Sequence, residues 1–134
     1  MDRYAVMGNP VAHSKSPRIH TLFAEQTDQN LQYDAILVER GGLNSAVADF
    51  LSRGGRGLNI TVPFKEDAWA LSSTRSKRAE RAGAVNTLVL DKSGRHFGDN
   101  TYMGLRCSKL YAVSQQRTVN RITYSSPCPG RGCL

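Results

Sequence analysis

The sequence predicts an α/β fold: a three-layer α/β/α sandwich with a mostly parallel sheet, followed by an irregular C-terminal tail. Over residues 1–101, apolar runs of strand length alternate with segments of helical periodicity. This alternation is typical of parallel strands joined by crossover helices. From Tyr102 to Leu134 neither period persists, and the segment ends in a cluster of proline, glycine, serine and cysteine.

The first elements are a strand over residues 3–8 that ends at Gly8-Asn9-Pro10, then a helix over 18–26. Ser16 is placed as the N-cap of this helix and Pro17 as its first residue. Its apolar positions recur at helical spacing: Ile19, Leu22, Phe23 and Gln26. We therefore expect this helix to pack through that stripe.

Three further elements continue the alternation. The run 31–39 predicts a strand, and 43–53 predicts a helix with one apolar face. That face consists of Leu43, Val47, Phe50 and Leu51. The glycine-rich segment 54–57 predicts a turn into a strand over 58–63.

A second helical stretch is expected from Phe64 to about Ala82, with a break near residues 72–74. Residues 84–91 and 95–99 then predict two strands paired as a hairpin across Lys92-Ser93-Gly94. The order of elements therefore predicts a sheet covered by helices on both faces.

Composition and charge exclude several classes of protein. The 134 residues suffice for one domain, and no apolar run approaches the ~20 residues of a membrane span. Residues 1–3 lead into a strand and not into a signal peptide, so we expect a cytoplasmic protein without membrane contact. The basic run 75–81 is interrupted by Glu80 and lacks aromatic residues, which predicts no nucleic-acid partner.

The charge is distributed unevenly along the chain. The net charge is +7, yet residues 1–101 are nearly neutral. The segment 102–134 holds five basic residues, no acidic residue and all three cysteines: Cys107, Cys128 and Cys133. The spacing of the cysteines matches no metal-binding pattern, so we expect free thiols and no metal.

Two serines immediately precede the first predicted helix, in the sequence HSKSP. Free backbone N–H groups and the helix dipole favour an anion at a helix N-terminus. Ser14 and Ser16 therefore suit a carboxylate or a phosphate. On these residues alone, simple capping by Ser16 remains the alternative.

The sequence NITVPFK places two polar residues on one face of a strand. Asn59 and Thr61 project to the same side, and Pro63 ends the strand and begins a helix with Lys65 in its first turn. A cation there is disfavoured by the helix dipole, which favours proton transfer from Lys65. An exposed lysine is the alternative. Asn86, beside the next strand, suits a ligand hydroxyl or an ordinary turn.

Taken in order, YAVMGNPVAHSKSP, GLNITVPFK, AGAVNTL and GDNT resemble the N-terminal, substrate-binding domain of shikimate dehydrogenases. The resemblance covers residues 1–101 and implies NADPH-dependent reduction of 3-dehydroshikimate to shikimate in aromatic amino-acid biosynthesis. It implies that Ser14 and Ser16 hold the substrate carboxylate. The positions that contact the ring hydroxyls are Asn59, Thr61 and Asn86. Lys65 matches the substrate-contacting catalytic lysine.

The sequence departs from the family directly after GDNT. The family has the aspartate partner of the catalytic lysine at this position, and Tyr102 stands there instead; Asp99 matches another aspartate of the motif. No glycine-rich cofactor loop follows, so we expect the NADP-binding Rossmann domain to be absent and the chain to be a truncated, inactive fragment. A shift of reading frame accounts for the tail: back-translation with one nucleotide dropped gives an apolar strand and a glycine-rich loop.

Other interpretations remain open at this stage. The chain could be a non-catalytic module that binds shikimate or quinate and uses its basic tail for an anionic partner. Quinate could also replace shikimate as the substrate. The expected partner is a small molecule, and a homodimer is left open.

Overall fold

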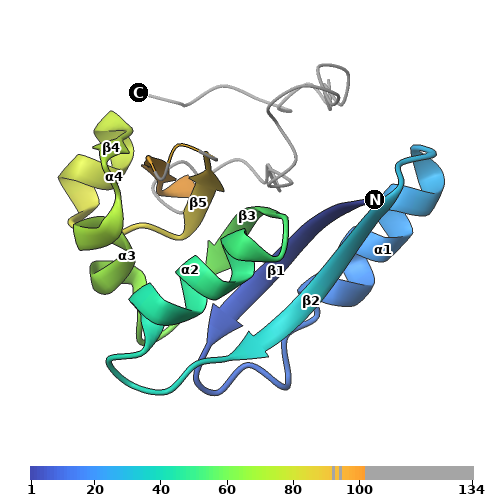
Figure 1. The fold of residues 1–134 in the computed structure, drawn as a ribbon, viewed down its shortest axis with the longest axis horizontal. Coiled ribbons are helices and arrows are strands. Elements are labelled where there is room, and N and C mark those ends of the chain that lie inside the picture. The colour runs from blue at the N-terminus through green and yellow to red at the C-terminus, as the bar shows by residue number, and fades with distance from the viewer. Residues whose placement is uncertain (92, 94, 102–134) are drawn as a thin grey trace, which may run out of the picture.

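The computed structural model describes residues 1–91, 93 and 95–101. The predicted tail, including Tyr102 and the three cysteines, lies outside these residues, as do Lys92 and Gly94 of the predicted hairpin turn. The elements are β1 (Asp2–Gly8), α1 (Ser16–Gln26), β2 (Leu31–Leu37), α2 (Leu43–Ser52), β3 (Gly55–Ile60), α3 (Lys65–Leu71), β4 (Thr74–Arg75), α4 (Lys77–Ala82), β5 (Thr87–Leu90) and β6 (His96–Asp99). Their order is the predicted alternation (Figure 1).

The strands form one sheet in the order β2-β1-β3-β5-β6-β4. Pairings β1–β2, β1–β3 and β4–β6 are parallel, whereas β3–β5 and β5–β6 are antiparallel. The hairpin of β5 and β6 was predicted and is confirmed. The α/β sandwich is confirmed, with a mixed sheet in which parallel pairings prevail.

Alternation along the strands divides the buried residues between the two faces of the sheet. On β1, Tyr4 and Val6 belong to a cluster with Val11 and Tyr33, and α1 packs on this side. Ala5 and Met7 point to the opposite face. We call the first the α1 face and the second the α2 face.

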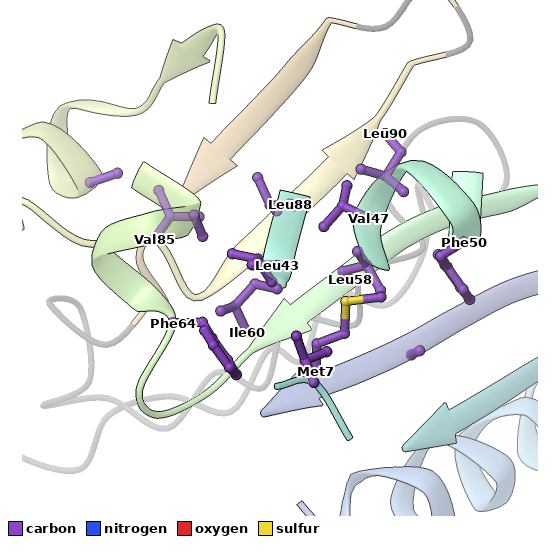
Figure 2. Close-up of a cluster of buried hydrophobic side chains, with 14 residues drawn as sticks. Met7, Leu43, Val47, Phe50, Leu58, Ile60, Phe64, Val85, Leu88 and Leu90 are labelled. Atoms are coloured by element: carbon purple, nitrogen blue, oxygen red, sulfur yellow. The ribbon is translucent and has the colours of Figure 1, made fainter. Parts of the chain in front are cut away.

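The larger core lies on the α2 face. Leu58 and Met7 are fully buried there, beneath the apolar side of α2. Figure 2 shows the core side chains converging from β1, α2, β3 and β5. The predicted inner positions of α2 are buried, namely Leu43, Val47 and Phe50, and Leu51 packs against them. This core fixes β3 in the middle of the sheet.

The start of α1 differs from the prediction. Ser16 is the first residue of the helix and not its N-cap, because Lys15 already has nearly helical backbone angles (φ −84°, ψ −7°) and takes the cap position. The buried positions are His20 and Ala24, whereas Leu22 is 47% exposed. The helix packs through His20, whose ring stacks on Tyr33, and this contact turns Leu22 towards solvent.

Two other segments also differ from the prediction. The glycine-rich turn is shorter than expected, because β3 already begins at Gly55 and pairs there with Arg3 of β1. A Cβ at Gly55 would collide with the ring of Phe50, so only glycine lets the strand run beneath α2. The predicted break in the second helical stretch is confirmed between α3 and α4, but the short strand β4 in it was not predicted; β4 pairs with β6.

Among the described residues, no helix has the length and apolar character needed to cross a membrane.

The core predicts a large effect for Leu58→Ala. Leu58 is completely buried, so removal of its side chain leaves a cavity beneath α2 and should lower the free energy of unfolding by about 2–5 kcal/mol. Urea unfolding followed by circular dichroism measures this change. Leu22→Ala, at a 47% exposed leucine, is the control and should change stability little. Equal losses in both variants would contradict the assigned core.

Candidate functional site

The residues expected to bind a ligand gather where β1 and β3 end, on the α1 face. In open α/β sheets, ligands bind beside the carboxyl ends of parallel strands. Asn9 joins the loops at this edge: its N–H donates to the Val62 carbonyl (3.0 Å) and its Nδ2 donates to the Val38 carbonyl (3.0 Å). A Cβ on Gly8 would collide with the methyl group of Thr61, so glycine brings the end of β1 close to that residue.

Ser14 and Ser16 lie together at the beginning of α1. The Ser14 hydroxyl oxygen accepts a hydrogen bond from the backbone N–H of Ser16 (3.3 Å). Ser14 therefore satisfies one of the N–H groups at the helix start, the task that the sequence assigned to Ser16. The Ser16 side chain lies near the phenol of Tyr33 and lowers its pKa, against the larger effect of burial, which raises it.

Asn59 lies on the α1 face, opposite Val6 of β1 and Thr87 of β5. The neighbouring Ile60 is buried in the core of the other face, as alternation requires. The Asn59 Oδ1 accepts a hydrogen bond from the Tyr33 hydroxyl (2.6 Å), and its Nδ2 lies 3.5 Å from the Asn86 carbonyl and 3.4 Å from Thr87 Oγ1. The Asn59 amide is therefore held between β2 and β5.

Asn86 connects three segments of the chain. Its carbonyl accepts from the Ile60 N–H (2.9 Å), and its own N–H donates to the Asp99 carbonyl (3.0 Å). Its side-chain Nδ2 donates to Thr101 Oγ1 (3.0 Å), while Oδ1 accepts from the Thr101 N–H (3.1 Å). Asn86 thus brings the last residue of the GDNT motif beside β3.

Lys65 is the first residue of α3, as predicted from Pro63. A turn in which the Phe64 N–H donates to the Thr61 carbonyl (3.1 Å) joins β3 to this helix. The Lys65 carbonyl accepts from the Val85 N–H (2.8 Å), so its backbone lies next to the residue that precedes Asn86. Thr61, Lys65 and Asn86 therefore occupy one corner of the domain.

A series of polar side chains, most of them joined by hydrogen bonds, extends across the α1 face. We call it the polar network; its members are Ser14, Ser16, Tyr33, Asn59, Asn86 and Thr101. Four of the six predicted site residues belong to it, and Thr61 and Lys65 lie beside it through backbone contacts. Tyr33 and Thr101 were not predicted as site residues. Thr101 ends the GDNT motif, whose resemblance to the family is the signal that could have found it, whereas nothing local to Tyr33 indicates its contact with Asn59.

A cavity of about 420 Å³ lies on the opposite face, between α2 and the edge strand β2. Its charged lining residues pair with one another, Arg3 with Asp34 (3.8 Å) and Arg53 with Asp49 (2.9 Å). No member of the polar network lines it. The cavity is therefore separate from the candidate site.

Residues 6–88 match the family model described as the shikimate dehydrogenase substrate binding domain. The chain belongs to the shikimate dehydrogenase family. It is 60% identical over 101 residues to a protein of Hahella chejuensis and 62% identical over 100 residues to one of Alkalilimnicola ehrlichii, both named shikimate dehydrogenase (NADP(+)). Each match covers 75% of this chain and 37% of the relative, so the chain spans little more than a third of their length.

Solved structures of the family share this fold. A shikimate 5-dehydrogenase of Thermus thermophilus, in complex with shikimate, superposes with a TM-score of 0.69 at 40% identity over 75% of this chain and 38% of that one. A Pseudomonas putida enzyme called Ael1 gives a TM-score of 0.72 at 46% identity, over 75% of this chain and 36% of that one. The matches cover the first three quarters of the chain.

The described residues do not fit NADP, the cofactor in the names of these shikimate dehydrogenases. A dinucleotide site needs a glycine-rich loop between a strand and the N-terminus of a helix, so that the pyrophosphate can approach the backbone. Within residues 1–91, 93 and 95–101, β1 leads into Asn9-Pro10, and β2 leads into α2 through residues 38–42, whose only glycines are Gly41 and Gly42. The same residues contain no group of three or more histidine, cysteine, aspartate or glutamate side chains placed to hold a metal.

Asp99, the aspartate of GDNT in this chain, holds α4 against β6. Its carboxylate accepts hydrogen bonds from the Ser76 hydroxyl (2.5 Å) and from the guanidinium of Arg78, with which it forms an ion pair. Ser76 caps α4 by accepting from the Ala79 N–H (3.1 Å). Partial burial opposes ionisation of Asp99, but the bonds from Arg78 and Ser76 outweigh it and lower its pKa. Asp99 therefore anchors α4 to the sheet through Ser76 and Arg78.

This anchor predicts a pH-dependent effect for Asp99→Asn. Because the folded-state pKa lies below the ordinary 3.8, the charged carboxylate stabilises the domain above that pH, and the contribution is lost as pH falls through the folded pKa. Asp99→Asn should therefore lower the melting temperature at pH 7, and the gap to wild type should narrow below about pH 4. Thermal unfolding of both proteins, from pH 7 to below about pH 4, measures the difference in melting temperature. Asp67→Asn, at an exposed residue of α3, is the control; a gap that is constant with pH would contradict the assignment.

Proposed function

We propose that residues 1–101 are the substrate-binding domain of an NADP-dependent shikimate dehydrogenase, which reduces 3-dehydroshikimate to shikimate. The observation that carries the proposal is the polar network on the α1 face, with hydroxyls at the start of α1 and amides at the ends of β3 and β5. Shikimate carries a carboxylate at one end of its ring and hydroxyls at the other. The network offers groups for both ends.

The carboxylate is assigned to Ser14 and Ser16. Both hydroxyls stand at the N-terminal end of an 11-residue helix, where the helix dipole attracts a negative charge. The helix has no acidic residue in its first turn to repel an anion. Hydroxyl donors to a charged acceptor make stronger hydrogen bonds than donors to a neutral one.

The ring hydroxyls are assigned to Asn59, Thr61 and Asn86. An amide can donate and accept at once, which suits a ligand hydroxyl that does the same. The Asn59 amide on β3 lies 3.5 Å from the backbone carbonyl of Asn86, the residue that precedes β5. Thr61 adds a hydroxyl on the same side of the chain, after the end of β3.

Lys65 is assigned as the acid and base at the reacting oxygen. A ketone oxygen takes up a proton when it is reduced to a hydroxyl, and a lysine ammonium can supply it. Lys65 begins α3 directly after the corner that holds Thr61. Cofactor binding is assigned to the second, Rossmann domain of the family, because the described residues hold no dinucleotide loop.

Direct binding tests the substrate assignment. We expect shikimate to bind the 134-residue chain in isothermal titration calorimetry, and Ser14→Ala or Ser16→Ala to weaken binding about tenfold or more because each removes a bond to the carboxylate. Ser45→Ala, at an exposed serine of α2, is the matched control. Parallel titrations with quinate show whether the chain binds shikimate or quinate more tightly. No binding of either ligand by a folded wild-type chain would overturn the proposal.

Catalysis by the chain is tested separately from ligand binding. We expect no NADP-dependent oxidation of shikimate by the chain alone, because hydride transfer needs a nicotinamide held against the substrate. The absorbance of NADPH measures it, with a full-length relative as the positive control. Formation of NADPH by the wild-type chain, absent from Lys65→Met purified in the same way, would show that the chain catalyses the reaction by itself.

A further inference from the structure

Tyr33 stands at the centre of the polar network although it lies within an apolar strand. Its side chain is only 6% exposed and packs in the cluster of Tyr4, Val6 and Val11. The imidazole of His20 stacks on its ring at 4.2 Å with an interplanar angle of 7°. The Tyr33 ring is therefore packed tightly between α1 and β1, which fixes the position of its hydroxyl.

The Tyr33 hydroxyl bonds to one end of the candidate site and lies near the other. It donates to Asn59 Oδ1 (2.6 Å). Burial raises the pKa of this phenol more than the neighbouring Ser16 side chain lowers it, so the group stays protonated and remains a donor.

This bond decides which way the Asn59 amide faces. An asparagine side chain can turn by 180° and exchange its oxygen and nitrogen. Here the donor at Tyr33 requires the oxygen, and the Asn86 carbonyl on the other side requires the nitrogen. The contacts of Nδ2 are long, at 3.5 and 3.4 Å, so the short bond from Tyr33 is the stronger constraint.

We propose that Tyr33 is a positioning residue of the substrate site: its hydroxyl bonds to Asn59 Oδ1 and so fixes the orientation of the Asn59 amide, to which the ligand hydroxyls are assigned. The role in binding rests on the proposed function; the orientation of Asn59 does not. Tyr33 itself need not touch the substrate. It acts on Asn59 through one rigid side chain.

The side-chain amide signals of Asn59 test the orientation without any ligand. In ¹H–¹⁵N spectra of the full chain, the Asn59 pair is identified by its loss in Asn59→Ala. We expect Tyr33→Phe to shift or broaden this pair, because the bond to Oδ1 is gone. Tyr4→Phe is the matched control: Tyr4 is equally buried (7%) in the same cluster, and among the described residues its hydroxyl bonds to no member of the polar network. An unmoved Asn59 pair in Tyr33→Phe would overturn the proposal.

A double-mutant cycle tests the role in binding. Tyr33→Phe should weaken shikimate binding about fivefold in the wild-type background and by much less in Asn59→Ala, because Tyr33 acts largely through Asn59. Tyr4→Phe should leave shikimate binding unchanged both in the wild-type background and in Asn59→Ala. Equal losses in both backgrounds would mean that Tyr33 only supports packing and would overturn the positioning role. If the wild-type chain binds no shikimate, the proposed function fails, and the Asn59 signals still decide the orientation.

Discussion

Asn86 is the residue on which the candidate site depends. Its backbone groups bond to β3 and β6, and its side chain bonds to Thr101, so one residue sets the spacing of three segments. These side chains are half-buried, and leaving their polar groups unpaired would lower the stability of the arrangement. Once β5 is in register, Asn59 and Thr101 have little freedom to lie elsewhere.

The large core and the site share β3 but use opposite sides of it. Leu58 and Ile60 bind the strand to the apolar side of α2, while Asn59 faces the α1 side between them. Packing on one face therefore holds a polar side chain rigidly on the other. The smaller cluster of Tyr4, Val6, Val11 and Tyr33 supports the polar side chains from their own face.

Much of this arrangement could be predicted from the sequence, because it depends on local pattern. The alternation around Asn59, the helix start at Lys65 and the apolar side of α2 all follow from spacing within a few residues. The role of Tyr33 could not be predicted, since its partner Asn59 is 26 residues away and a tyrosine in an apolar strand suggests ordinary core. The start of α1 was misplaced for a similar reason: the angles of Lys15 depend on how the loop after β1 folds.

The strand order has a consequence for how the sheet is completed during synthesis. The short strand β4 pairs only with β6, which follows it in the chain by some twenty residues, and α4 is held there by Asp99. Strands β1, β2 and β3 pair with one another and can assemble as soon as they emerge. Strand β4, at the outer edge of the sheet, has no strand to pair with until His96 to Asp99 have been synthesised. Strands β1, β2 and β3 can therefore form first, and β4 joins the sheet only after β6 has been synthesised.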